Sequence, residues 1–270
     1  MPRSKKQIVI CADDFGQNEA INRGILQLAR MGRISATSCL TQAPAWSQGA
    51  AALRSCDIDV GLHLNFTEDF ATGSDFHRPL PVLIRDAWLR RLNSVTLQRA
   101  IECQCDLFEQ YMKREPDYFD GHQHVHQFPQ IRDALMEVLL RRYDCDDFWV
   151  RYTGMSDPAF FRGLALKARV IALLGSAALR RRLARADIPF NSDFAGVYEL
   201  SGGSARYATA MRTWLTQIAA GGVIMCHPAA AVERPDTIGE QRVAEFSFLS
   251  GDDFGEMLQA CGCRVARFQT

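Results

Sequence analysis

Several common functional signatures are missing from this chain of 270 residues. No C-x-x-C pair occurs, which argues against zinc-ribbon and thioredoxin-type sites. No run of eighteen apolar residues occurs, so we expect no transmembrane segment. The chain also lacks the G-x-x-x-x-G-K-[ST], G-x-G-x-x-G, G-x-S-x-G and H-E-x-x-H patterns. ATP use, nicotinamide use and covalent serine chemistry therefore lack their usual marks.

The chain has no excess of charge either, because 31 Lys and Arg residues balance 31 Asp and Glu residues. Proteins that bind the phosphate backbone of nucleic acids usually carry a net positive charge, so nucleic acid is not expected as a partner. The nine Cys residues are expected to be reduced, buried thiols. The apolar run Ile8–Cys11 is too short for a signal-peptide core. We therefore expect a cytoplasmic protein, with a homodimer left open.

One long stretch carries no acidic residue between its ends, Asp157 and Asp187. Its basic residues are Arg162, Lys167, Arg169, Arg180, Arg181, Arg182 and Arg185. Apolar residues at helical spacing accompany them, which predicts an amphipathic helical insertion at 157–187 with a solvated basic face. The alternative is that 162–185 covers the active site and favours an anionic or lipid-linked substrate.

Short apolar runs alternate with longer segments of helical periodicity. The predicted strands are Ile8–Cys11, Ala36–Leu40, Val60–Leu64, Tyr118–Phe119, Phe148–Arg151, Val223–Cys226 and Val265–Phe268. The predicted helices are Asn18–Met31, Ser47–Arg54, Thr96–Met112, Ile131–Arg142, Ala205–Ala219 and Phe254–Ala260. This alternation predicts an α/β fold with mostly parallel strands, as one distorted (β/α) barrel domain over 1–270. A doubly wound open sheet is the alternative.

Two adjacent carboxylates, Asp13 and Asp14, follow the first predicted strand. The carboxyl ends of parallel strands are where active sites of such folds are built. Adjacent strand residues point to opposite sides, so we expect the two side chains to have different roles. One can bind a cation while the other accepts a proton. A helix N-cap or a turn is the structural alternative for Asp14.

Five of the six His residues also stand at or after predicted strand ends. His63 lies in the third strand, and His227 follows the sixth. His122, His124 and His126 alternate, so an extended segment would place all three on one face. Two His and one carboxylate with open positions suit a divalent hydrolytic metal such as Zn²⁺, whereas Mg²⁺ prefers oxygen ligands.

Four segments of the chain resemble the motifs of YdjC-like carbohydrate deacetylases. They are Ala12–Gly16 (ADDFG), Gly61–Thr67 (GLHLNFT), Asp120–His126 (DGHQHVH) and Met225–Pro228 (MCHP). The resemblance implies a distorted (β/α) barrel of the deacetylase type. It also implies a hydrolase that removes acetate from an N-acetylated amino sugar, such as an N-acetylglucosamine-containing oligosaccharide, with one divalent metal ion, Zn²⁺ or Mg²⁺.

By position, the metal ligands of that family fall on Asp14, His63 and His122. Asp13 matches its general base, and His227 matches its candidate general acid. From the residues themselves, we expect Arg151 to pair with Asp13 and orient it during catalysis. Further substrate contacts, or groups that orient the ligands, are expected at His124, His126, Asn65 and Phe15.

Two other functions are compatible with these residues. A metal-dependent phosphoesterase would use His124 and His126 to hold a second metal ion. A catalytically silent sugar-binding protein is the other alternative. The presence of both Asp13 and Asp14 argues against it, because a binding protein needs no base.

Overall fold

A computed structural model describes residues 5–70, 76–154 and 171–269. One curled sheet of eight strands forms its centre, in the order β5-β4-β3-β2-β1-β7-β6, and β8 pairs with β1. All pairings between these strands are parallel. The strands are β1 (Lys6–Phe15), β2 (Ala36–Cys39), β3 (Asp59–Leu64), β4 (Tyr118–Gly121), β5 (Trp149–Val150), β6 (Phe194–Ala195), β7 (Val223–Cys226) and β8 (Cys263–Val265).

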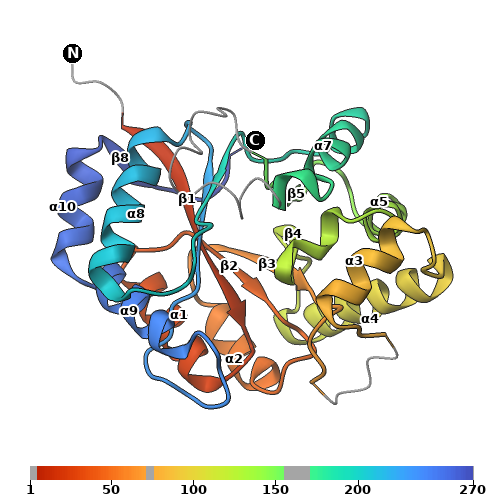
Figure 1. Ribbon diagram of the computed structural model, residues 1–270, viewed down its shortest axis with the longest axis horizontal. Coiled ribbons are helices and arrows are strands. Elements are labelled where there is room, and N and C mark those ends of the chain that lie inside the picture. The colour runs from red at the N-terminus through yellow and green to blue at the C-terminus, as the bar shows by residue number, and fades with distance from the viewer. Residues whose placement is uncertain (1–4, 71–75, 155–170, 270) are drawn as a thin grey trace.

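Helices cover the sheet on its outer side, and Figure 1 shows the C-terminal helices on one flank and α3 to α5 on the other. The helices are α1 (Glu19–Arg30), α2 (Trp46–Leu53), α3 (Leu80–Trp88), α4 (Ser94–Met112), η1 (His122–Gln127), α5 (Ile131–Arg142), α7 (Ser176–Arg185), α8 (Gly203–Gln217), α9 (Gly239–Ser250) and α10 (Asp252–Ala260). The prediction of a distorted (β/α) barrel with mostly parallel strands is confirmed. All six residues of β3 are buried, as expected for a parallel strand that is covered on both faces.

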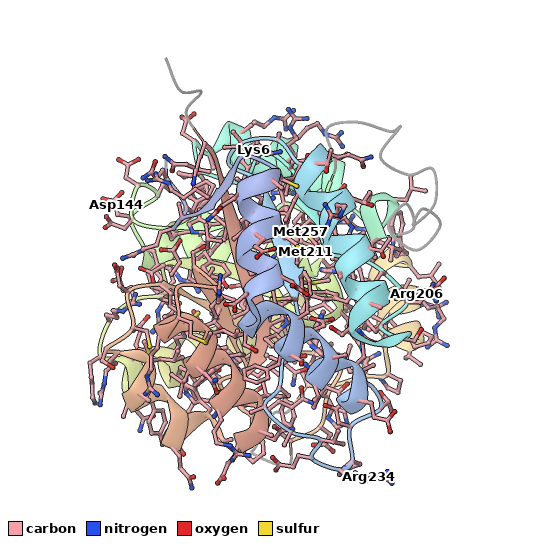
Figure 2. All side chains as sticks on the ribbon, turned by 90° about the vertical axis from the view of Figure 1, so that its left-hand side faces the viewer. Lys6, Asp144, Arg206, Met211, Arg234 and Met257 are labelled. Carbon is pink, nitrogen blue, oxygen red and sulfur yellow. The ribbon has the colours of Figure 1, made fainter. Side chains whose placement is uncertain are left out.

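Two C-terminal helices, α8 and α10, pack against each other, and α10 also packs against β8, which pairs with β1. Met211 of α8 and Met257 of α10, both buried, are labelled near the centre of Figure 2. Lys6 of β1 donates hydrogen bonds from Nζ to the carbonyl oxygens of Leu215 and Ile218, at 2.9 and 2.7 Å. A cation at a helix C-terminus is favoured by the helix dipole, so this contact fastens α8 to the first strand.

Four of these elements were not predicted from the sequence: β6, α3, α9 and η1. β6 has only two residues, which is too short for any periodic pattern, and α3 follows a loop-like segment. α9 buries Gln241, Arg242 and Glu245 along with Phe248 and Leu249. Its inward face is partly polar, so an apolar stripe at helical spacing is missing from its sequence.

The basic stretch is helical where the structure describes it, and residues 155–170 lie outside that description. α7 buries Leu179 and Leu183, while its arginines are exposed. Arg182 contacts Asp133 at 3.0 Å, and Ile171 lines the candidate site. Among the described residues, no helix combines the length and the apolar character that crossing a bilayer requires.

Candidate functional site

An irregularity at the end of β1 places two adjacent carboxylates on the same side of the strand. Ala12 pairs with Thr37, whereas Phe15 pairs with Cys39, so Asp13 and Asp14 together lie opposite a single residue of β2. Asp14 has φ 72°, in the left-handed region. Such a bulge re-aims side chains, and both carboxylates line one cavity. The expectation from regular strand geometry, that they point to opposite sides, is therefore wrong.

The cavity has a volume of about 600 Å³ and lies at the carboxyl ends of the strands. This is within the range that small-molecule sites usually occupy. Asp13, Asp14, His63, His122, His124, His227 and Arg242 are among its lining residues. Chemistry-bearing residues from β1, β3, η1, the end of β7 and α9 are thus brought together, although they are far apart in sequence.

One carboxylate and two imidazoles form a compact donor set in this cavity. The ligand atoms of Asp14, His63 and His122 all lie within 4.8 Å of one another. Oδ1 of Asp14 lies 3.6 Å from Nε2 of His63 and 3.0 Å from Nδ1 of His122. Burial lowers the pKa of His122, but Asp14 and Glu68 outweigh it and raise that pKa to about 9. The position thus favours positive charge, and its donors fit a divalent metal ion.

The other carboxylate, Asp13, is held by a buried arginine. Arg151 donates from Nη1 to Oδ2 of Asp13 at 2.7 Å and from Nη2 to Oδ1 at 2.6 Å. Both side chains are buried. Burial raises the pKa of Asp13, but Arg151 outweighs that effect and holds the pKa well below its usual value. Asp13 is therefore an ionised carboxylate with a fixed orientation.

Asp120, the last residue but one of β4, supports both parts of this arrangement. Its Oδ1 accepts a hydrogen bond from Nδ1 of His63 at 2.6 Å. Its Oδ2 contacts Nη2 of Arg151 at 2.7 Å and accepts a hydrogen bond from Ser38 at 2.6 Å. Asp120 is fully buried. It therefore fixes the ring of His63 with Nε2 toward the cavity.

His227 lines the same cavity and directly follows β7. Burial lowers the pKa of its imidazole to about 4, so the ring is neutral at pH 7. Its backbone N–H donates to Oε2 of Glu245 at 2.6 Å. Glu245, from α9, is fully buried and also accepts a hydrogen bond from Tyr198. Burial raises the pKa of Glu245 to about 7.

The three alternating histidines do not share one face, because their segment is not extended. His122–Gln127 forms a tight 3₁₀ turn in which Gln123 and His124 have left-handed φ values. His126 donates from Nε2 to the carbonyl oxygen of Arg151 at 2.9 Å, and His124 packs edge-on against Phe194. Of the three rings, only that of His122 joins the donor set described above.

Phe15 and Asn65, which were also predicted to contact the substrate or orient the ligands, lie in surroundings that give them structural roles. Phe15 is fully buried against Trp46 and does not line the cavity, so core packing replaces the expected substrate contact. Asn65 accepts hydrogen bonds from the backbone N–H groups of Thr67 and Glu68, and its Nδ2 donates to the carbonyl oxygen of Glu68. It shapes the loop that carries Glu68, whose Oε1 lies 3.6 Å from Nε2 of His122.

Sequence reasoning missed four residues of the site: Asp120, Arg242, Glu245 and Glu68. Asp120 begins the third motif, so its position beside His122 was a usable signal. Glu68 follows the second motif closely. Arg242 and Glu245 belong to α9, which lies outside the four motifs. Only the fold brings Arg242 to the cavity and Glu245 to the backbone of His227.

Comparison with known proteins finds curated relatives of similar sequence. A carbohydrate deacetylase of Danio rerio is 28% identical over 165 residues, 57% of this chain and 50% of that protein. A chitooligosaccharide deacetylase of Enterobacter sp. (strain 638) is 28% identical over 148 residues, 51% of this chain and 57% of that protein. The matched region therefore spans about half the length of these curated relatives.

A solved structure from Enterococcus faecalis V583, whose name refers to cellobiose-phosphate cleavage, has the same fold. Its TM-score is 0.69 at 18% identity, with 98% of both chains covered. The family model described as YdjC-like protein matches residues 7–260, nearly the whole chain. This match confirms the resemblance of the four motifs, and the chain belongs to the YdjC-like protein family.

Proposed function

We propose that this chain is a metal-dependent hydrolase that removes acetate from an N-acetylated amino sugar, with residues 1–270 acting as one domain. The observation that carries the proposal is the position of Asp13. It is an ionised carboxylate, fixed by Arg151, and its Oδ2 lies 4.0 Å from Nε2 of His63 in the donor set. The names of the curated relatives support the same reaction.

Asp14, His63 and His122 would hold the metal ion, and their two imidazoles favour Zn²⁺ over Mg²⁺. When bound, the ion would polarise the amide carbonyl group and lower the pKa of water. Arg242 donates to Oδ2 of Asp14 at 2.7 Å, which leaves Oδ1 on the side of the histidines. The carboxylate is thus held in place by the protein itself.

Asp13 would act as the general base. Because Arg151 keeps this carboxylate ionised, it can accept the proton of the attacking water molecule across the neutral pH range. The two hydrogen bonds from Arg151 fix both of its oxygens, so the base does not have to reorient. A general base needs a low enough pKa to be free of its proton and a defined direction, and both conditions are met here.

His227 would donate the proton to the leaving amine. Burial keeps its ring neutral at rest, while the charges of Asp13 and Asp14 act to raise its pKa. We propose that His227 takes up a proton from solvent and passes it to the amine nitrogen as the C–N bond breaks, while Asp13 holds the proton of the attacking water and later releases it to solvent. The backbone contact with Glu245 holds the start of the loop that carries the ring.

The phosphoesterase alternative finds less support in the structure. It needs a second metal site built with His124 and His126. Among the described residues, the donor groups are Asp14 with His63 and His122, and Asp13 with His63 and Asp120. Neither group contains His124 or His126, and the second group is already bonded to Arg151.

The proposal is tested by acetate release. Protein loaded with Zn²⁺ or Mg²⁺ is incubated with N-acetylglucosamine, its short oligosaccharides and a generic phosphate ester. We expect acetate from at least one N-acetylated sugar and no phosphate from the ester. Release of phosphate without acetate would favour the phosphoesterase. Sugar binding without acetate release under either metal would favour the silent binding protein.

A further inference from the structure

Arg242 is a buried cation on the wall of the candidate site, on α9, which lies outside the four motifs. Its guanidinium group donates from Nη2 to Oδ2 of Asp14 at 2.7 Å and to Gln17 at 3.2 Å. Nε donates to Oδ2 of Asp236 at 2.8 Å. Asp14 and Asp236 thus clamp the group from two directions, and only 3% of the residue surface is exposed. Its orientation is fixed.

The third nitrogen of this group, Nη1, is different. It is buried and has no hydrogen-bond partner among the described residues. A buried charged donor without an acceptor costs free energy, so such groups in native proteins usually have a partner. Arg242 lines the cavity that also contains Asp13 and His227. Arg242 therefore combines an unpartnered charged donor with a place on the wall of the cavity.

We propose that Arg242 is a substrate-binding residue whose Nη1 donates a hydrogen bond to an oxygen atom of the bound glycan, a hydroxyl or the acetyl carbonyl. The inference rests on the proposed function for the identity of the ligand. The donor would hold the sugar against the Asp14 side of the cavity, because Nη2 of the same planar group is bonded to Asp14. A planar guanidinium can serve Asp14, Asp236 and the substrate at once, which a lysine ammonium cannot.

Asp236 connects this donor to the loop between β7 and α9. Residues 235–238 of that loop line both the site cavity and a second cavity of about 780 Å³. Figure 2 shows Arg234, on the same loop, at the outer edge of the molecule. The loop therefore reaches from the bonded guanidinium to the surface, and Arg242 ties the wall of the sugar site to the Asp14 carboxylate.

Two variants test the role. Arg242→Lys keeps the charge and is expected to fold, but it loses the planar guanidinium group and its several N–H donors. Arg242→Ala leaves room for a free guanidinium ion. For both variants we expect weaker binding of an N-acetylglucosamine disaccharide in calorimetry, and a KM raised by about ten- to a hundredfold, the usual value of a charged hydrogen bond. Millimolar guanidinium chloride is expected to restore part of the activity of Arg242→Ala only.

Arg132→Ala is the matched control, because Arg132 is also buried and bonded to an aspartate but does not line the cavity. It should leave disaccharide binding unchanged and show no response to guanidinium. Zn²⁺ titrations and thermal melts of each variant report separately on the Asp14 carboxylate and on folding.

The outcomes separate the two proposals. Disaccharide binding and KM unchanged in Arg242→Lys would overturn the role of Arg242 while leaving the hydrolase standing. Disaccharide binding that is weakened in both variants, in a protein that releases no acetate, would support Arg242 and reject the hydrolase. A wild-type protein that neither binds the disaccharide nor releases acetate would reject both.

Discussion

His63 and Asp120 form a buried pair in which Nδ1 of the imidazole donates to Oδ1 of the carboxylate at 2.6 Å. The opposite nitrogen of the same ring, Nε2, lies 3.6 Å from Oδ1 of Asp14. A carboxylate on one ring nitrogen fixes the tautomer and leaves the lone pair on the other. The pair therefore decides which atom of His63 is available in the donor set.

Replacing Asp120 by Asn should weaken metal binding without removing it. Asparagine keeps the size of the side chain but loses the charge that holds His63 and Arg151. We expect the affinity for Zn²⁺, measured by calorimetry, to fall by about 10- to 100-fold, the usual cost of losing such a partner. Asp193→Asn is the control, because Asp193 is equally buried but accepts backbone hydrogen bonds from Phe194 and Ala219. Equal Zn²⁺ affinity in both variants would contradict the orienting role.

Substitutions of the two adjacent aspartates, Asp13 and Asp14, should produce two different phenotypes. Asp13→Ala should retain one metal ion per chain and lose turnover, because the donor set of Asp14, His63 and His122 is intact. Asp14→Ala should lose the metal ion itself. Metal content by mass spectrometry and acetate release by enzymatic assay distinguish the two results. A nearly fully active Asp13→Ala protein would show that Asp13 is not the base.

His227 should affect turnover alone. Its ring is outside the donor set, so His227→Ala is expected to keep its metal content. Turnover should slow by about 10²–10⁴-fold, the usual contribution of one acid-base group. His77→Ala serves as the control, since His77 lies outside the cavity and its side chain is 41% exposed. If the rate constant of His227→Ala equals that of the control, the residue has no part in proton transfer.

The raised pKa of the buried Glu245 carboxyl group predicts that the stability of the protein depends on pH. Burial raises its pKa from 4.5 to about 7, so the folded state favours the protonated form. The contribution of this carboxyl group to the free energy of unfolding is then complete below about pH 4.5, and it is lost as the pH rises through 7. Between pH 5 and pH 8 the free energy of unfolding of the wild type should fall by about 2–3 kcal/mol relative to Glu245→Gln, which cannot ionise.

Urea unfolding of both proteins at pH 5, 6.5 and 8 measures this difference. The comparison with Glu245→Gln cancels the effect of other titrating groups that are unchanged between the two proteins. A constant difference over this range would mean that Glu245 keeps an ordinary pKa in the folded state.

Local patterns were enough to predict much of the fold. The strands from β1 to β5 and β7 are apolar runs bounded by polar residues, and each lies where its sequence pattern placed it within a few residues. α9 was missed because the residues it buries include Gln241, Arg242 and Glu245. A search for apolar residues at helical spacing finds helices with an apolar buried face. It misses a helix that presents polar groups to a functional cavity.

The sequence by itself determined that acidic and imidazole side chains stand at the ends of parallel strands, because strand ends are read from the chain locally. The tertiary structure decided which of them meet. The bulge at Asp13 and Asp14 overrode the alternation of a regular strand, and the left-handed turn at Gln123 and His124 dispersed a histidine triplet. Both are backbone irregularities of one or two residues, which no side-chain period records. The contact of Arg242 with Asp14 spans 228 positions, so only chain packing could reveal it.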